Sequence, residues 1–191
     1  MASTYNIWLG NPRHASYRWQ ELCAEVVKLF LPVIKKHRDF DRVCVRSTKE
    51  KPSLLPHELL VYVVPGLSHG VIATRFGSRK KSEDQYGYTE WEGAETGAEV
   101  YIRQLEPQHV AKFVFHEALH AKTHLDGPAL HKEGGLAAGH LDYYDAVLTK
   151  SDVALMSKHL SNAYTPWSGG FDAVTPQGKI DTNTDDPLAG L

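Results

Sequence analysis

Two histidines spaced four residues apart constrain the fold of this chain more than any other feature of its sequence. His116 and His120 enclose the segment HEALH, and apolar side chains recur around it at spacings of three and four. Residues four apart in a helix lie one turn apart on the same face. We therefore predict a helix over this segment that presents both imidazoles on one side.

Proline and glycine indicate where this helix begins and ends. Pro107 stands where the helix can begin, because proline is favoured in a first turn. Gly127-Pro128 is expected to end it, since glycine favours a helix C-terminus and proline cannot continue one. The apolar stripe between these points consists of Val110, Phe113, Val114 and Leu119.

Strands and one long helix are predicted upstream of this segment. The long helix is expected to start after Ser16, as its cap, and to reach Ile34, with Pro32 kinking or shortening its last turn. The polar segment 78–97 has neither the helical nor the strand period and is predicted to be an exposed loop. Alternating or β-branched runs predict strands over residues 5–9, 42–46, 58–64, 70–76 and 99–105.

Two shorter helices are predicted downstream, at about 141–148 and 153–163. Ser151 is a candidate cap for the second of them. The chain from Thr165 onward is rich in Pro, Gly, Asp and Thr, and residues 168–191 are expected to form a loosely ordered tail.

This order of elements predicts an α+β (mixed α/β) fold. A twisted mixed sheet is expected to be backed by helices, with the HEALH helix following the last strand. The length of 191 residues suits a single domain over residues 1–167. We expect an N-terminal part over about 1–126 and a smaller, mainly helical part over about 127–167.

The overall composition indicates a soluble globular protein. Hydrophobic residues make up 42% and charged residues 23%, and a net charge of −2 points neither to nucleic acid nor to an anionic membrane as partner. Two cysteines make no disulfide framework and are expected to be buried thiols. Residues 1–11 lack the basic start and apolar run of a signal peptide, and no stretch approaches the ~20 apolar residues of a membrane span. We expect a soluble protein made in the cytoplasm, which is compatible with delivery by a route that needs no cleaved signal.

A histidine pair of this spacing is suited to bind one zinc ion. Ring nitrogens from both residues can reach a single Zn²⁺ at about 2.0–2.1 Å. Glu117 follows the first histidine, where its carboxylate can accept a proton from a zinc-activated water and later pass it to a leaving amine. The same spacing also occurs by chance on amphipathic helices, but several further ligand candidates follow closely here. We therefore predict one Zn²⁺ bound by His116 and His120, with Glu117 as general base.

A third ligand is needed, and the residues after His120 supply several candidates. His124 continues the same helical face, but its Cα lies about 12 Å along the axis from that of His116, too far for one ion. His131 is our choice, because the chain after the glycine–proline pair can turn back toward the metal. The alternatives that stay open are Asp126, Glu133 and Asp142.

With this motif the sequence resembles the zincin metallopeptidases. His116, Glu117 and His120 match the HExxH pattern of that family, and the predicted element order resembles the zincin N-terminal subdomain. The resemblance covers roughly residues 5–165 in outline, but only the motif is specific. It implies that an edge strand, here taken as residues 70–76, pairs with an extended substrate above the metal.

The branch within the zincins stays open. Asp126 has the spacing of the third ligand in the metzincin branch, but Thr123 stands where that branch has a glycine. The segment 139–142, Gly-His-Leu-Asp, vaguely resembles the ligand segment of the aspzincin branch but lacks its threonine.

The predicted function is the hydrolysis of peptide bonds in a protein or peptide substrate. By analogy, the small size and the missing signal segment suit a toxin- or effector-type protease. The alternative is a catalytically inactive zincin-fold binding module with a structural zinc, although such a site has no need of Glu117. A third interpretation is a metal-free domain in which the motif occurs by chance.

Overall fold

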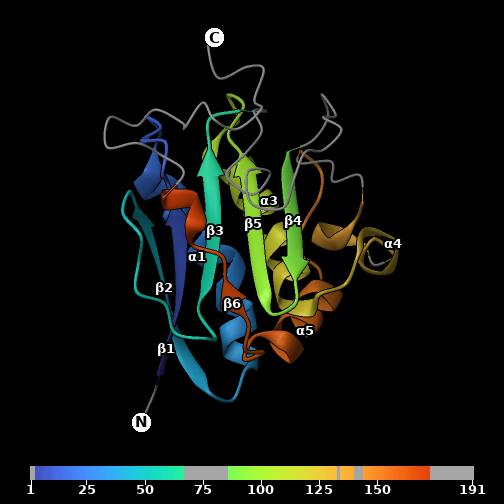
Figure 1. Cartoon of the computed structure of the whole chain (residues 1–191). Helices are drawn as coiled ribbons and strands as arrows, with labels where there is room; N and C mark the ends of the chain where they lie inside the picture. The colour runs from blue at the N-terminus through green and yellow to red at the C-terminus, as the bar shows by residue number, and fades with distance from the viewer. Residues whose placement is uncertain (1–2, 67–85, 133, 140–143, 173–191) are drawn as a thin grey trace.

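The chain folds into a layered arrangement of helices against a mainly parallel sheet (Figure 1). The mixed α/β class predicted from the sequence is confirmed at this level. No helix in the described part of the chain is both long and apolar enough to cross a membrane. In this computed structural model the described residues are 3–66, 86–132, 134–139 and 144–172.

Among the described residues the elements follow one another as strand, helix, four strands and then mainly helices. The strands are β1 (Ser3–Gly10), β2 (Phe40–Thr48), β3 (Leu59–Val64), β4 (Gly87–Glu92), β5 (Glu95–Tyr101) and β6 (Thr165–Pro166). The helices are α1 (Trp19–Lys36), α3 (Pro107–Thr123), α4 (Gly127–Leu130) and α5 (Lys150–His159), with short 3-10 helices η1 (Gly135–Ala137) and η2 (Gly169–Phe171).

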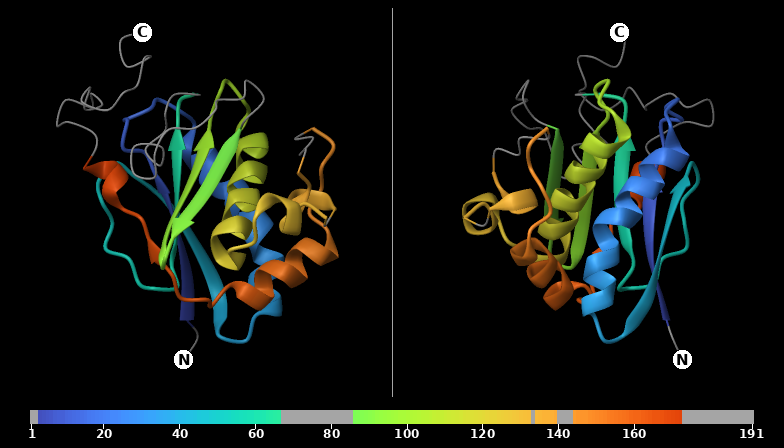
Figure 2. Two further views of the ribbon diagram at one scale, coloured as in Figure 1. Left: turned by 45° about the vertical axis from the view of Figure 1, so that its right-hand side comes forward. Right: turned by 180° about the vertical axis from the view of Figure 1, so that it is seen from behind.

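The sheet has the strand order β2-β1-β3-β5-β4. Its first four members in this order pair in parallel, whereas β4 runs antiparallel to β5 at one edge. The short β6 adds a parallel pairing at the start of β5. Both α1 and α3 cover one face of the sheet, and the segment around β6 and η2 lies on the other (Figure 2).

The central strand β3 explains why the two layers hold together. All six of its residues, LLVYVV, are buried, as expected for a parallel strand covered on both faces. Toward the helices, the rings of Phe30 on α1 and Phe115 on α3 pack with centroids 5.0 Å apart. Toward the other face, the hydroxyl of Tyr62 donates a hydrogen bond of 2.7 Å to the carbonyl of Trp167. Each such fully buried side chain contributes about 1.5–3 kcal/mol.

The helix α1 follows its predicted stripe but not its predicted ends. Its buried residues recur at spacings of three and four, while Pro32 is exposed and the helix continues past it to Lys36. Of the two effects expected of Pro32, a kink or a shortened last turn, the shortening is therefore wrong. Ser16 is not the cap either, because the helix begins at Trp19 with Arg18 as N-cap and no capping side chain.

The loop predicted over residues 78–97 is wrong for its described part. Residues from Gly87 onward form β4 and the start of β5, joined by a tight turn in which Gly93 has a φ of +60°. The polar and glycine-rich composition concealed an alternation in which Thr89 faces α3 and Tyr88 packs on the opposite face. The strand predicted at 99–105 accordingly begins earlier, at Glu95, and ends at Tyr101.

Of the last two predicted helices, one corresponds to an observed helix and the other does not in its described part. Residues 144–148, the described part of the helix predicted at 141–148, form a turn followed by chain without regular structure, so that prediction is wrong there. Ala146 and Leu148 pack on the core although the chain there is irregular. Their apolar spacing was therefore interpreted as a helical stripe. The second prediction corresponds to α5, which Thr149 caps in place of Ser151.

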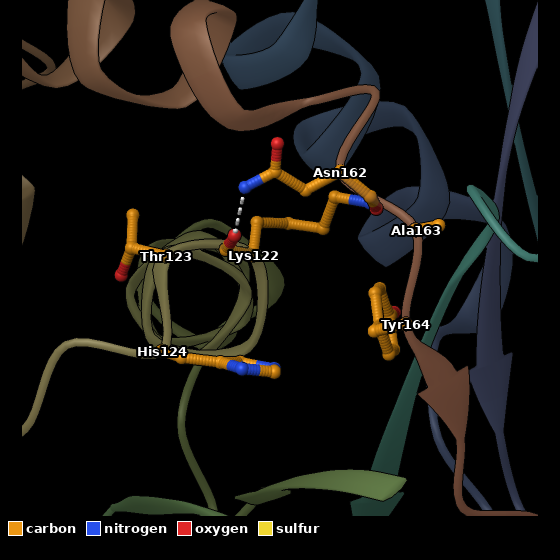
Figure 3. A pocket seen from close by; sticks show the side chains of 6 residues that line it. All are labelled: Lys122, Thr123, His124, Asn162, Ala163 and Tyr164. Carbon is orange, nitrogen blue, oxygen red and sulfur yellow. Dashed lines mark hydrogen bonds between the residues drawn. The ribbon is translucent and has the colours of Figure 1, made fainter. Parts of the chain in front are cut away.

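A buried lysine ties α3 to the C-terminal part of the chain. Lys122 is 2% exposed, and its Nζ donates to the carbonyls of Asn162 at 2.7 Å and His57 at 3.2 Å. The ring of Tyr164 lies 4.6 Å from the same Nζ, and the Asn162 amide returns a hydrogen bond to the Lys122 carbonyl (Figure 3). Burial lowers the pKa of Lys122 from 10.5 to about 7.

This lysine predicts a rise in stability with pH. The unfolded chain keeps the ordinary pKa of 10.5, so between about pH 7 and 10 it binds a proton that the folded chain does not. The free energy of unfolding should therefore increase by a few kcal/mol over this range, at about 1.4 kcal/mol per pKa unit. Urea unfolding of the metal-free protein at pH 7, 8 and 9 would measure this. The variant Lys122→Met should lack the increase, and equal pH dependence in both proteins would contradict the assignment.

Candidate metal centre

Three imidazoles converge between α3 and the loop that follows it. His116 and His120 lie one turn apart on α3, and His131 caps the C-terminus of α4. Their candidate ligand atoms all lie within 4.8 Å of one another, and this group could hold a metal ion. The Nε2 atoms of His120 and His131 are 3.2 Å apart. Two nitrogens bound to one tetrahedral zinc ion are separated by about 3.3 Å, given Zn–N bonds of about 2.0–2.1 Å.

Backbone carbonyls set the tautomers of the two helical histidines. The Nδ1 of His116 is 2.7 Å from the carbonyl oxygen of Leu136, and the Nδ1 of His120 is 2.8 Å from that of Leu125. A carbonyl oxygen only accepts hydrogen bonds, so each Nδ1 carries the proton and donates it. The lone pair of each imidazole is therefore on Nε2, the atom that a metal ion would bind.

Burial keeps these imidazoles neutral. It lowers the pKa of His116 to about 4, opposed by the hydrogen bond to Leu136 and reinforced by the neighbouring histidines. The pKa of His120 is lowered in the same direction, again mainly by burial. Because only a neutral imidazole can bind a metal, both residues are in the correct protonation state at neutral pH.

The turn after α3 begins earlier than predicted. The helix ends at Thr123, and His124 takes the left-handed conformation with a φ of +52°. Its ring stacks on Trp91 with centroids 5.3 Å apart and lies 2.9 Å from the hydroxyl of Thr96, contacts that hold this conformation. The prediction that Gly127-Pro128 ends the helix is wrong. Both residues belong to α4, where proline is favoured in the first turn.

The other third-ligand candidates have different positions. Asp126 is the N-cap of α4, and its Oδ1 accepts a hydrogen bond of 2.9 Å from the Ala129 amide. The convergent group contains His131 and not Asp126. Glu133 and Asp142 lie outside the described residues. Space for His131 depends on a glycine, since a Cβ on Gly139 would come within 2.6 Å of its Nδ1.

Glu117 lies against the edge strand β4. The side chain is 4% exposed, and the hydroxyl of Thr89 donates a hydrogen bond of 2.6 Å to its Oε2. A Cβ on Gly87 would collide with the same carboxylate, so that position needs a glycine. Sequence reasoning missed Gly87 and Thr89 because both fall in the segment predicted to be a loop.

The edge strand predicted to bind substrate, residues 70–76, lies outside the described residues. In the described part of the sheet, the edge beside α3 is β4. This antiparallel strand contacts α3, the helix that carries two of the histidines. The carboxylate of Glu117 lies where α3 and β4 meet.

Comparison of the chain with family models, curated proteins and solved structures finds no match in any of the three. The class of this protein is therefore defined by its own residues. It is a mixed α/β domain with a group of three histidines that could hold a metal ion.

Proposed function

We propose that the chain is a zinc-dependent metallopeptidase of the zincin type. His116, His120 and His131 would hold one Zn²⁺, and Glu117 would act as general base. The observation that carries the proposal is the convergence of three imidazoles, together with the buried carboxylate of Glu117, which follows His116 on α3.

The ligand set favours zinc in a catalytic site. Imidazole nitrogens suit zinc among the common divalent ions, whereas magnesium and calcium prefer oxygen ligands. Structural zinc sites use four protein ligands, while catalytic sites use three and leave the fourth position to water or substrate. The group of three histidines among the described residues corresponds to the second type. When bound, zinc would supply a water of pKa near 7 and polarise a substrate carbonyl.

Glu117 would perform the proton transfers. Its carboxylate is oriented by Thr89 and has limited freedom beside Gly87, so it accepts a proton from the attacking water without first reordering. The same carboxylate then carries that proton to the leaving amine. Proximity and fixed orientation of this kind reduce the entropy lost on reaching the transition state.

The arrangement around the helix supports the zincin assignment. A mixed sheet with an antiparallel edge strand precedes the histidine helix, and the residues after it form mainly short helices. We assign to β4 the role of the strand along which an extended peptide lies, because its side chains contact Glu117. His131 follows His120 by 11 residues, which differs from the metzincin spacing, so we assign no branch.

The substrate class that fits is a protein or peptide, and an effector-type protease remains an analogy. The second candidate function is a binding module with a structural zinc. One observation weighs against it: Thr89 and Gly87 are both adapted to Glu117, a residue that a structural site does not use.

Peptidase activity should depend on zinc. The purified protein, loaded with one equivalent of zinc, is incubated with a peptide mixture from a proteome digest, and new peptide termini are identified by mass spectrometry. We expect new termini that disappear with a chelator and return when zinc is restored. A protein that binds about one zinc per chain but produces no new termini would favour the binding module.

A further inference from the structure

A second buried carboxylate lies behind the metal centre, on the far side of the loop that holds His116. Asp152, in the first turn of α5, is 1% exposed. Its Oδ1 accepts a hydrogen bond of 3.1 Å from the amide of Ala137, and its Oδ2 accepts one of 3.1 Å from the amide of Leu136. Both donors belong to η1 and precede Asp152 by 15 and 16 residues.

A capping box fixes the position of this carboxylate. Thr149 donates to Oδ2 of Asp152 from both its amide and its hydroxyl, each at 2.7 Å. The Asp152 amide returns a hydrogen bond of 3.1 Å to the Thr149 hydroxyl. A capping box consists of two bonds, from the Thr149 amide to the Asp152 carboxylate and from the Asp152 amide to the Thr149 hydroxyl. The two bonds from η1 to Asp152 are therefore additional to helix capping.

The loop also needs a glycine next to Asp152. Gly135 has a φ of +66°, and a Cβ there would collide with the carboxylate of Asp152 and with the side chain of Thr149. Both the backbone conformation and the available space therefore exclude other residues at this position. The segment is built so that its amides can approach the carboxylate closely.

One peptide group connects Asp152 to His116. The carbonyl of Leu136 and the amide of Ala137 belong to the same peptide unit. Its oxygen accepts from Nδ1 of His116, and its N–H donates to Oδ1 of Asp152. An anionic acceptor on the N–H polarises the peptide and makes its oxygen a stronger acceptor. The imidazole is then held more firmly in the tautomer that leaves Nε2 available.

We propose that Asp152 is a positioning residue of the metal centre, acting on His116 through the peptide between Leu136 and Ala137. It corresponds in effect to a carboxylate that hydrogen-bonds a metal-bound histidine directly, but with one peptide unit interposed. The inference rests on the proposed function in that it requires a metal at the three histidines. It does not require that the protein cleave peptides.

The test compares two variants of the same capping box. Asp152→Asn replaces one acceptor oxygen by an NH2 group that donates and cannot accept hydrogen bonds, with little change in shape. Thr149→Ala removes the cap but leaves the bonds from Asp152 to η1. Zinc affinity is measured by competition with a chromophoric chelator, and the coordination geometry by the visible spectrum of the Co²⁺-substituted protein.

We expect Asp152→Asn to bind zinc about 10–100-fold more weakly than the wild type and to alter the Co²⁺ spectrum. Thr149→Ala should lower the midpoint of thermal unfolding by about 2–4 °C, and because the bonds from Asp152 to η1 stay, it should change affinity and spectrum much less than Asp152→Asn does. If zinc affinity and spectrum are the same in Asp152→Asn and the wild type, Asp152 is a helix cap only and the proposal is overturned.

A measurement on the wild type covers the case in which Asp152→Asn does not fold. Zinc binding should move the NMR signal of the Ala137 amide proton, because the metal on His116 strengthens the chain of hydrogen bonds that ends there. An Ala137 signal that stays unchanged on zinc binding overturns the proposal. A wild type that binds no zinc overturns the proposed function together with this one, so the two failures are distinguishable.

Discussion

Replacing Glu117 by glutamine should abolish peptide hydrolysis while the protein still binds about one zinc ion per chain. Glutamine keeps the shape of the side chain and can still contact Thr89, but it cannot accept a proton from the attacking water. General acid–base catalysis contributes about 10²–10⁴-fold, so the turnover number should fall by at least this factor. The rate of appearance of new peptide termini and the zinc content of the same sample measure the two effects.

The matched control for this prediction is Glu50→Gln, which removes an exposed carboxylate from the chain just after β2, the edge strand opposite β4. Its activity should equal that of the wild type. Full activity in Glu117→Gln would exclude the proposed mechanism, whereas loss of both activity and zinc would mean that the carboxylate helps to hold the metal.

Replacing His131 by alanine should weaken zinc binding by about 100- to 1,000-fold. Zinc sites of four ligands have apparent binding free energies of about 10–16 kcal/mol, and one quarter of this corresponds to that range of affinity. His131 is the one member of the group outside α3, so its loss leaves a two-histidine site on a single helix. Chelator competition at fixed pH measures the change.

Asp126→Asn is the control for His131→Ala, because Asp126 is one of the alternative ligands that the sequence offers. It caps α4 through its side chain, and asparagine is an equally good N-cap. Its zinc affinity should therefore remain close to that of the wild type. The reverse pattern, with weak binding in Asp126→Asn and normal binding in His131→Ala, would show that the third ligand is misassigned.

The edge strand shows where sequence reasoning failed. In β4 the residues that face α3 or its C-cap are Gly87, Thr89 and Trp91, and of these only Trp91 is large and apolar. The usual strand signal is alternation of apolar and polar residues, and it is weak when one face of the strand lines a polar site. Because the segment serves the site, its composition was taken for that of an exposed loop.

The N-cap of α5 could be predicted from the sequence, but the prediction chose the wrong residue. Thr149 and Asp152 have the spacing of a capping box, whereas Ser151 was predicted from its residue type alone. The bonds from Asp152 to η1 could not be predicted in this way. They join segments 15 and 16 residues apart, and nothing local specifies that those segments meet.

The sequence by itself determined that His116, Glu117 and His120 share one helix, with the two imidazoles on one face. A separation of four residues is one turn in any α-helix, so this result does not depend on the rest of the fold. It also indicated His131 as a ligand candidate, since the chain needs to turn back after the helix.

Tertiary structure alone decided how these residues are held. His124 adopts a left-handed conformation without a glycine because Thr96 and Trp91, on strands far away in sequence, hold its ring. Leu136 reaches Nδ1 of His116 across 20 residues, and Thr89 reaches Glu117 across 28. Periodicity reports which way a side chain points from its own element. Which groups it then meets depends on how the elements pack, and that packing is set by the whole core.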